Sequence, residues 1–382
     1  MSNIKILLIN PPYTIYGGVE GQGGKNTPLN LAYLASYLRE HKDDMDIRIV
    51  DAEGLDMTFE TLYQEVDRFS PHIVGITCPT AAYYNIQKIC THLKQKDPDV
   101  KIVLGGAHPT ALPKETLEET GCDAVVIGEG EITFHLLVNA WHYGTDLDRI
   151  DGIAFKDNGE IRTTAPRALI ENLDIVPLPA KDLLPIDKYF LPPTKRIRSE
   201  RATNMVTSRG CPFTCTWCSH AVFGQSHRRR SPEHVADEVA WIRKRYDPDR
   251  LWFADDVFTL NRPWTTALAA VMGERGLQIP FECISRADRL DERMADDLAS
   301  LGCHRLWIGA ESGSQRILDR MQRRTDVADV QRKTALLQER GIASAILGIV
   351  DNYAHGIGAE PLTLEAFDAQ LEQNAGRARA LL

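Results

Sequence analysis

The chain has 382 residues, a length that suggests two or three domains. Hydrophobic residues make up 43% and charged residues 25% of the sequence, which excludes a wholly disordered protein. The 53 acidic and 44 basic side chains give a net charge of −9, and this balance disfavours a protein that binds the backbone of a nucleic acid.

Short apolar segments alternate with helical patterns over the first 141 residues. Strands that are apolar on both faces and separated by helices indicate a parallel, doubly wound sheet of the Rossmann-like (flavodoxin-like) kind. Such a sheet binds ligands beyond the carboxyl ends of its strands. The predicted strands are 4–9, 47–50, 73–77, 101–104 and 124–127, and the predicted helices are 28–41, 59–69, 81–96, 113–120 and 131–141.

The alternation stops in residues 146–200. A hairpin is predicted where the segments 150–156 and 161–164 flank Asn158 and Gly159, and six prolines follow it. We interpret this segment as a connector between a first domain, residues 1–145, and a second.

The second domain, residues 201–350, returns to the strand and helix alternation. Five repeats of this kind indicate an α/β domain that is either another open sheet or part of a barrel, and a sixth strand is not evident. The tail, 351–382, is predicted to be a loop and a helix. The predicted strands are 204–207, 251–254, 281–285, 305–309 and 343–349, and the predicted helices include 232–246, 290–301 and 327–339.

Two features bear on the compartment and the ligand. No apolar run approaches the roughly 18 residues of a membrane helix, and the apolar stretch at the N-terminus is too short for a signal peptide. Eight cysteines do not form a disulfide framework in a chain of this length, so we expect a cytoplasmic protein. Residues 195–250 carry 12 basic and 6 acidic side chains, which suits a buried negatively charged ligand or cluster.

Three cysteines follow the first strand of the second domain: Cys211, Cys215 and Cys218. Thiolates this close in one loop can converge on one metal centre. A zinc ion would take them together with His220, whereas an iron–sulfur cluster would keep one iron open to another ligand. Unrelated buried cysteines are the third alternative, and the spacing lacks the paired Cys-x₂-Cys units typical of zinc sites.

The pattern Cys-x₃-Cys-x₂-Cys, with the aromatic Trp217 before the last cysteine, resembles the signature of radical S-adenosylmethionine enzymes. The resemblance implies a 4Fe-4S cluster on the three cysteines and a partial (β/α)6 barrel. The open iron would bind S-adenosylmethionine, with Trp217 against its adenine side. It also implies an external electron donor such as flavodoxin or ferredoxin, and a small-molecule substrate.

Later strand ends fit the same resemblance. Asp255 and Asp256 resemble the acidic pair of the cobalamin-linked subgroup, where one carboxylate would accept a hydrogen bond from the ligand's ammonium group. Arg286 would reach the ligand's carboxylate. Glu311 and Ser312 would face the ribose. The alternatives are a capping or solvated acidic pair, a surface arginine and a strand-end turn without a ligand.

Glycines and polar residues at the carboxyl edge of the first sheet resemble the cobalamin-binding domain of one radical S-adenosylmethionine subgroup. Glycines without a Cβ let the backbone approach a flat macrocycle closely. With the connector, the resemblance covers about residues 3–350. The residues that it assigns to cobalamin binding are Asn10, Gly17, Gly18, Pro79, Thr80, Gly105, Gly106, His108, Gly128, Glu129, Gly130 and Glu131.

None of the eleven histidines has an Asp two residues before it, so the cobalt-ligating motif of cobalamin mutases is absent. This pattern fits the subgroup, which commonly binds cobalamin without a histidine ligand, and it equally fits a domain that binds nothing. We expect neither His108 nor Cys78 to ligate cobalt. The arginine run 228–230 is interpreted as the solvated start of a helix, with contact to an anionic ligand as its alternative.

The C-terminal part departs from the family pattern. The fifth strand leads into Val350-Asp351-Asn352 instead of a Gly-Leu-Pro-Gly-Glu-like turn, and about thirty residues follow. We therefore expect a barrel that is incomplete at this end. The predicted function is a cobalamin-dependent radical methyltransferase that acts on an unactivated carbon through methylcobalamin and a 5′-deoxyadenosyl radical. The alternatives are an anaerobic cyclase or rearrangement enzyme, and a non-catalytic cobalamin- or metal-binding regulator.

Overall fold

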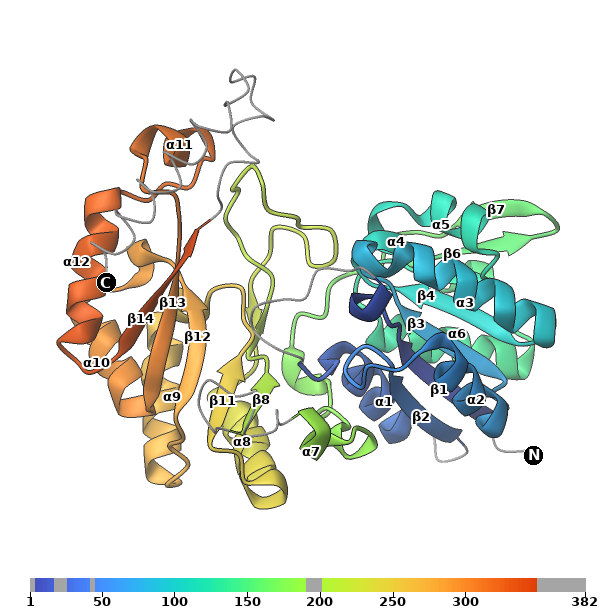
Figure 1. Ribbon diagram of the computed structural model, residues 1–382, viewed down its shortest axis with the longest axis horizontal. Coiled ribbons are helices and arrows are strands. Elements are labelled where there is room, and N and C mark those ends of the chain that lie inside the picture. Colours follow the sequence, from blue (N-terminus) through green and yellow to red (C-terminus); the bar gives the residue numbers. More distant parts are fainter. Residues whose placement is uncertain (1–3, 17–25, 42–44, 190–200, 349–382) are drawn as a thin grey trace. The chain divides into compact units, whose positions relative to one another are not determined.

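The computed structural model describes residues 4–16, 26–41, 45–189 and 201–348 (Figure 1). The chain forms two compact units. The first comprises residues 1–199 and 221–224, and the second comprises 200–220 and 225–382. The predicted helix in the tail 351–382, as well as Gly17 and Gly18, lie outside the described residues.

The first unit is built on a seven-stranded sheet in the order β2-β1-β3-β4-β5-β6-β7. Its first five strands are parallel, and their order 2-1-3-4-5 is that of flavodoxin-like folds. The predicted hairpin extends the same sheet as the antiparallel strands β6 and β7. The strands are β1 Ile4–Asn10, β2 Met45–Asp51, β3 Ile73–Thr77, β4 Lys101–Gly105, β5 Ala124–Val126, β6 Ile153–Asp157 and β7 Glu160–Thr163.

Helices of this unit pack apolar side chains against the sheet, whose central strands are buried on both faces. Leu7 and Ile9 of β1, for example, belong to the same core as Ile86 and Ile89 of α3. The longer helices are α1 Leu29–His41, α2 Phe59–Phe69, α3 Tyr83–Lys96, α5 Pro113–Thr120 and α6 Glu131–Tyr143, with the short α4 Ala107–Ala111 and α7 Ile186–Tyr189.

The helix α4 was not predicted from the sequence. It begins after Gly106, whose φ of +108° is a conformation that side chains with a Cβ rarely adopt. The backbone N–H of Thr110 then donates to the carbonyl of Gly106, and that of Leu112 to the carbonyl of His108. Tertiary structure thus makes one helical turn out of a segment whose glycines predict a loop.

The second unit holds a five-stranded parallel sheet in the order β14-β13-β12-β11-β8. Neighbours in space are therefore successive in the chain, as in the wall of a β/α barrel. This is the predicted partial barrel, with five strands in the described residues. The strands are β8 Ala202–Met205, β11 Arg250–Phe253, β12 Phe281–Ser285, β13 Cys303–Glu311 and β14 Ala343–Gly348, and a separate two-stranded ribbon joins β9 Ser208–Arg209 to β10 Arg228–Arg229.

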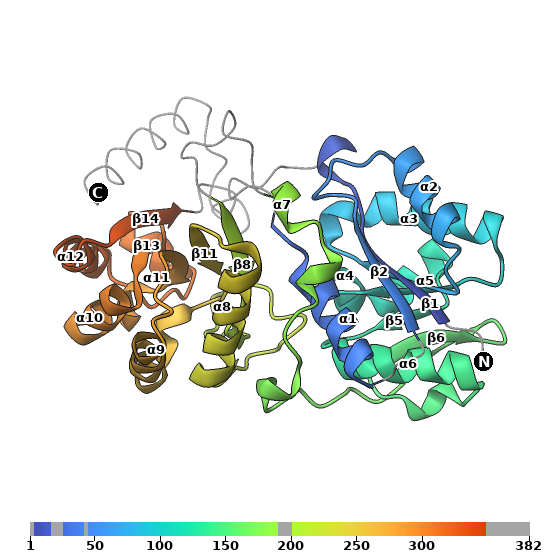
Figure 2. The same ribbon diagram turned by 90° about the horizontal axis from the view of Figure 1, so that it is seen from below.

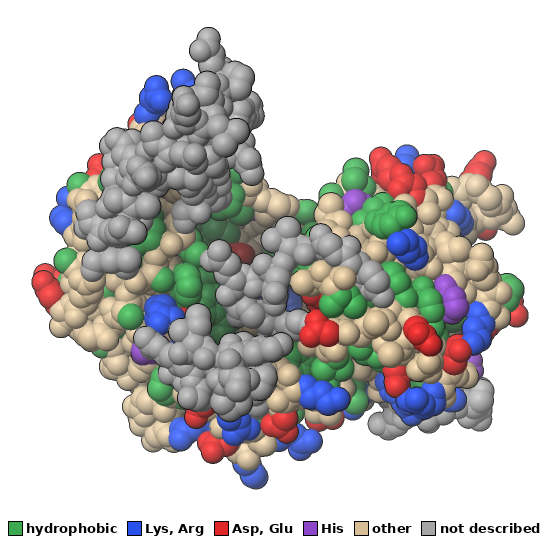
Figure 3. Space-filling model, viewed as in Figure 1, with side chains coloured by type: hydrophobic (Ala, Val, Ile, Leu, Met, Phe, Trp, Pro, Cys, Tyr) green, Lys and Arg blue, Asp and Glu red, His purple; other side chains and the backbone are tan. Residues whose placement is uncertain are grey.

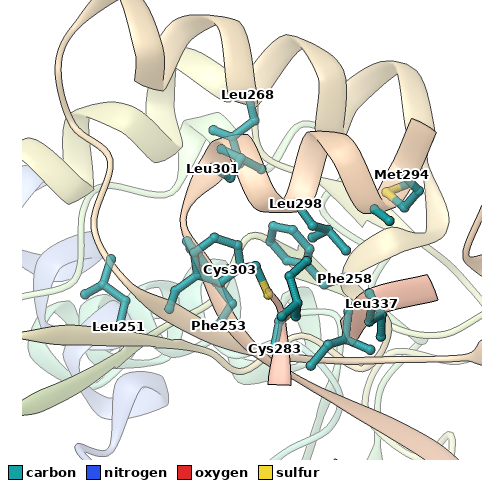
Figure 4. Packing of buried hydrophobic residues seen from close by; sticks show 14 of the residues in the cluster. Leu251, Phe253, Phe258, Leu268, Cys283, Met294, Leu298, Leu301, Cys303 and Leu337 are labelled. Carbon is teal, nitrogen blue, oxygen red and sulfur yellow. The ribbon is translucent and has the colours of Figure 1, made fainter. Parts of the chain in front are cut away.

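Four helices cover one face of this sheet (Figures 1 and 2). Their apolar residues interlock with those of the strands. In Figure 4, Leu298 and Leu301 of α10 lie over Cys283 of β12 and Cys303 of β13. The helices are α8 Pro232–Tyr246, α9 Arg262–Glu274, α10 Glu292–Leu301 and α12 Val327–Gln338, and the short α11 Gln315–Arg320 follows β13.

The surface in Figure 3 carries both acidic and basic side chains, scattered over the described residues. Among those residues, no helix combines the length and the apolar composition that crossing a bilayer requires.

Candidate functional site

The three-cysteine loop starts where β8 and β9 end, at the carboxyl edge of the second sheet. Gly210 precedes it with a φ of +81°. A Cβ at this position would lie 2.5 Å from the carbonyl oxygen of Ser226, so only glycine permits the close approach of the two chain segments. The turn after Gly210 therefore sets the position of Cys211.

The three thiols of the loop differ in exposure. Cys215 is buried, Cys211 is half-buried and Cys218 is exposed. Burial raises the pKa of the thiols of Cys211 and Cys218, and the neighbouring thiolates raise both further. In the described part of the chain, no three His, Cys, Asp or Glu side chains are grouped as a site for a metal ion. The zinc set of the three cysteines with His220 is therefore not assembled there.

The donor set nevertheless fits a 4Fe-4S cluster. Each thiolate of such a cluster binds a different iron atom, so the sulfurs are spread around a cube and do not surround one ion. Among the buried polar atoms without a hydrogen-bond partner within the described residues are two that lie within three residues of the loop in the sequence, Oγ of Ser208 and Nε2 of His220. Buried polar atoms without a partner so close to the loop in the sequence are consistent with a site that a bound group completes.

Two buried guanidinium groups contact Cys215. Nη1 of Arg286 and Nη1 of Arg323 each lie 3.7 Å from its Sγ atom. Arg286 directly follows β12, and it is only 1% exposed, so the alternative of a surface arginine is wrong. Arg323 was not identified from the sequence, because it stands beside Arg324 in a polar turn that looks solvated.

The two residues of the acidic pair after β11, Asp255 and Asp256, have different surroundings. Asp255 is buried and accepts hydrogen bonds from the backbone N–H of Thr207, 2.6 Å, and of Ser208, 3.2 Å. It therefore holds the backbone that enters the cysteine loop. Asp256 is exposed. Desolvation by its surroundings and then the charge of Asp255 raise the pKa of Asp256, while His220 opposes that rise.

The arginine run 228–230 is buried, so its interpretation as a solvated helix start is wrong. Arg228 pairs with Arg209 across the ribbon β9–β10. Nη2 of Arg229 lies 3.6 Å from Oδ2 of Asp255. Arg230 forms a buried ion pair with Glu238 of α8 and donates to the carbonyl of Val206, 3.0 Å. The run thus ties both ends of the cysteine loop to the barrel wall.

The end of β13 places Glu311 in a strained conformation. Its φ is +64° although it is not glycine, and its side chain is buried. Desolvation raises the pKa of Glu311, and the charges of Arg323 and Arg286 oppose that rise. Strain of this kind persists where surrounding structure enforces it, and it is concentrated at ligand sites.

The remaining residues predicted to bind S-adenosylmethionine are also located. Oγ of Ser312 accepts a hydrogen bond from the backbone N–H of Ser314, 3.1 Å, within a strand-end turn. Trp217 is 38% exposed, on the segment between the second and third cysteines. The roles of Ser312 and Trp217 in binding S-adenosylmethionine stay predictions.

The carboxyl edge of the first sheet brings part of the predicted cobalamin set together. Nδ1 of His108 lies 3.2 Å from Oγ1 of Thr80, next to Pro79, and its ring contacts that of Tyr83 at a tilt of 32°, with centroids 4.0 Å apart. The backbone N–H of Gly128 donates to Oγ1 of Thr110, 3.1 Å. Gly105 has room for a Cβ, with its nearest neighbour 3.8 Å away.

Three predicted members of this set belong to the scaffold. Nδ2 of Asn10 donates to the buried carboxylate of Asp51, 2.7 Å. Oε2 of Glu129 accepts from the backbone N–H of Ile170, 2.8 Å. Glu131 is buried in the first turn of α6, directly after Gly130.

Exposed apolar side chains at the same edge were not identified from the sequence. Ile15 follows β1, Tyr84 follows β3 and Leu112 follows β4, and each is at least 41% exposed. Apolar surface beside glycines suits a flat macrocycle. Cys78 is fully buried, and burial raises the pKa of its thiol to about 12. That it does not ligate cobalt stays an expectation.

Comparison with known proteins decides the family. The B12 binding domain model matches residues 19–138, and the Radical SAM superfamily model matches residues 205–359. An uncharacterised methyltransferase of Pyrococcus horikoshii is 39% identical over 321 residues, which cover 84% of this chain and 68% of the relative. The chain belongs to the cobalamin-dependent radical S-adenosylmethionine enzymes.

Other members of this enzyme family are similar over most of the chain. An anaerobic magnesium-protoporphyrin IX monomethyl ester cyclase of Rubrivivax gelatinosus is 30% identical over 91% of this chain and 62% of its own length. The chain thus spans about two thirds of the length of these relatives.

Solved structures share the fold. The cobalamin-dependent radical enzyme OxsB matches 97% of this chain and 51% of its own, with a TM-score of 0.76 and 21% identity. The methyltransferase TsrM of Kitasatospora setae, solved with cobalamin and a 4Fe-4S cluster, matches 99% of this chain and 70% of its own, with a TM-score of 0.76 and 19% identity.

Proposed function

We propose that this enzyme transfers a methyl group from cobalamin to an unactivated carbon of a small molecule. The observation that carries the proposal is the loop of Cys211, Cys215 and Cys218 at the carboxyl edge of a parallel barrel wall, in one chain with a B12-binding domain. The methyltransferase from Pyrococcus supports this assignment, and so does a cytidylyl-2-hydroxyethylphosphonate methyltransferase of Streptomyces wedmorensis that is 29% identical over 361 residues.

The residues of the second unit have distinct roles in this proposal. The three cysteines hold the 4Fe-4S cluster, and Asp256 accepts from the ammonium group of S-adenosylmethionine because Asp255 is already bonded to the loop backbone. Glu311 and Ser312 face the ribose, and Trp217 faces the adenine. Cluster and ligand together supply a 5′-deoxyadenosyl radical that takes hydrogen from the substrate, while cobalamin supplies the methyl group.

In the first unit, the backbone of Gly105, Gly106 and Gly128 approaches the corrinoid, with Thr80 and His108 beside it. We assign this role to residues 1–145, with 146–200 as connector and 201–350 as the radical domain. The hairpin of the connector adds β6 and β7 to the first sheet. Electrons come from an external donor such as flavodoxin or ferredoxin. We place the enzyme in the cytoplasm, because none of the eight cysteines, all of them among the described residues, is in a disulfide, as expected in a reducing compartment.

The test is anaerobic reconstitution of Cys211→Ala with iron and sulfide. We expect the variant to lose the cluster and the release of 5′-deoxyadenosine together, because removal of one thiolate leaves two of the three iron ligands. Cys122→Ala is the control, since Cys122 is a core residue of the first unit. Wild-type deoxyadenosine formation in Cys211→Ala would contradict the cluster assignment.

A cyclase is the second candidate, because the Rubrivivax relative is named for that activity, as is a homologous cyclase of Synechocystis that is 27% identical over 91% of this chain. The mass of the product separates the two reactions. A methyltransferase adds the mass of one methylene group to its substrate, whereas a cyclase removes hydrogen or adds oxygen. A protein that binds cobalamin and never cleaves S-adenosylmethionine would instead be a regulator.

A further inference from the structure

The environment of Cys215 differs from that of the two other loop cysteines. Two guanidinium groups point an Nη1 atom at its sulfur, each at 3.7 Å. For Cys218, the contact found among the described residues is a long one of 4.0 Å to the carbonyl of Ser219. For Cys211, burial raises the pKa of the thiol, while a hydrogen bond from the backbone N–H of Phe213 and the more distant charge of Arg286 lower it.

The protein holds both guanidinium groups firmly in place. Nε of Arg286 donates to Oδ1 of Asp288, 2.8 Å, and its Nη2 donates to the carbonyl of Arg323, 2.7 Å. The guanidinium carbon lies 3.8 Å from the ring centroid of Phe213, which is part of the cysteine loop itself. Arg286 is thereby fixed against the loop from two sides.

Arg323 is fixed by the end of β13. Its Nε donates to the carbonyl of Gly309, 3.1 Å, and lies 3.4 Å from Oε1 of Glu311. Both arginines are almost completely buried, so solvent screens their charges very little. Asp288 and Glu311 balance part of these charges, and the two Nη1 atoms remain as hydrogen-bond donors to one sulfur.

We propose that Arg286 and Arg323 are positioning residues that raise the reduction potential of the cluster through Cys215. The inference rests on the proposed function, because it concerns the cluster that the three cysteines would hold. Hydrogen bonds to the sulfurs and the nearby net charge set the potential of an iron–sulfur cluster, and positive charge favours the state that has gained an electron. This role replaces the predicted contact of Arg286 with the carboxylate of S-adenosylmethionine.

The test is the midpoint potential of the reconstituted cluster, measured by electron paramagnetic resonance in a redox titration without S-adenosylmethionine. Arg286→Gln and Arg323→Gln are each expected to shift the potential to a more negative value. The double variant is expected to shift it further. Iron and sulfide contents are measured in parallel, to show that the cluster is complete in each sample.

Arg289→Gln is the matched control. Arg289 also pairs with Asp288 and lies over Phe213, with 5.5 Å between its guanidinium carbon and the ring centroid. Its side chain is 40% exposed, and among the described residues its hydrogen bonds go to Asp288 and not to a cysteine sulfur. The loss of this charge is therefore expected to leave the potential at the wild-type value.

Arg286→Lys and Arg323→Lys provide a second measurement in case a glutamine variant does not assemble the cluster. Lysine keeps the charge but lacks the planar fork that reaches the sulfur and its other acceptor together, so these variants are expected to load iron and to shift the potential less. Wild-type potentials in both series would overturn the proposal. Weaker binding of S-adenosylmethionine at an unchanged potential would assign the arginines to that ligand. Wild-type protein without any cluster would instead refute the proposed function.

Discussion

The cysteine loop of the second unit and the carboxyl edge of the first sheet are built in opposite ways. Around the loop, buried charges are paired with one another or with backbone atoms, as in Arg230 with Glu238 and Asp255 with Thr207. At the edge of the first sheet, glycines, threonines and half-exposed rings form the surface. The loop must hold a small cluster at fixed sulfur positions, whereas the edge must admit a large flat ligand along its backbone.

The difference has an energetic consequence. Buried ion pairs are costly to break from one side, because the remaining partner keeps its charge without solvent. Backbone contacts from glycine depend on conformation and on the absence of a Cβ. Their loss is therefore expected to lower ligand affinity more than the stability of the fold. Substitutions near the loop should therefore affect folding strongly, and those at the edge should affect binding.

The largest effect is expected for Arg230→Met. This substitution leaves the buried carboxylate of Glu238 unpaired, which should lower the free energy of unfolding of the second unit by about 3–5 kcal/mol. The measurement is urea denaturation followed by circular dichroism. The double variant Arg230→Met with Glu238→Met should recover much of the loss, because no buried charge is then left alone.

The matched control for that experiment is Arg275→Met. Arg275 pairs with Asp237 of α8 at 2.6 Å, but both side chains are exposed. Surface pairs contribute about 0–1 kcal/mol, so this variant should unfold close to the wild-type urea concentration. If Arg230→Met and Arg275→Met lowered the free energy of unfolding equally, burial of the Arg230–Glu238 pair would make no difference to its contribution.

An intermediate effect is expected for Gly106→Ala. The φ of +108° at this position is unfavourable for alanine, which should cost about 1–3 kcal/mol of stability in the first unit. Cobalamin binding, measured by isothermal titration under anaerobic conditions, should weaken as well, because the edge after β4 must rearrange. Gly144→Ala is the control, since Gly144 also has a positive φ but follows the C-terminal end of α6, away from the carboxyl edge. It should lose stability without losing cobalamin affinity.

The smallest effect is expected for His108→Ala. Its ring contacts Tyr83 and Thr80, so its removal should weaken cobalamin binding by less than about tenfold, equivalent to 1.4 kcal/mol. The paramagnetic resonance spectrum of bound cob(II)alamin should be the same in variant and wild type. A nitrogen splitting that disappears in the variant would identify His108 as a cobalt ligand and make our expectation wrong.

Much of the fold was predictable because hydrophobic periodicity dominates both units. Every predicted strand is present, with ends displaced by only a few residues, since an apolar segment between helices has few ways to bury both faces. The helix α9 is not among the helices predicted by range, although Asn261 and Pro263 are the N-cap and first-turn residues that mark a helix start. The hairpin was predicted from the turn at Asn158 and Gly159. Its addition to the first sheet was not, because β6 pairs with β5, which lies far from that turn in the sequence.

The candidate site divides in a similar way. Spacing alone singled out Cys211, Cys215 and Cys218, because ligands of one centre that lie close in sequence leave a local signature. Arg323 left no such signature, since its contact with Cys215 spans 108 residues of chain. The burial of Arg229 was missed for the same reason, because Asp255 reaches it from another strand.

The sequence by itself determined the two parallel sheets, the order of their strands along the chain and the three clustered thiols, because periodicity and spacing are local properties. Only the tertiary structure decided which charges are buried around those thiols and which side chains of the predicted set serve the scaffold. The physical reason is that the energy of a charge depends on the partners and the solvent around it, and chain folding brings those partners from distant strands.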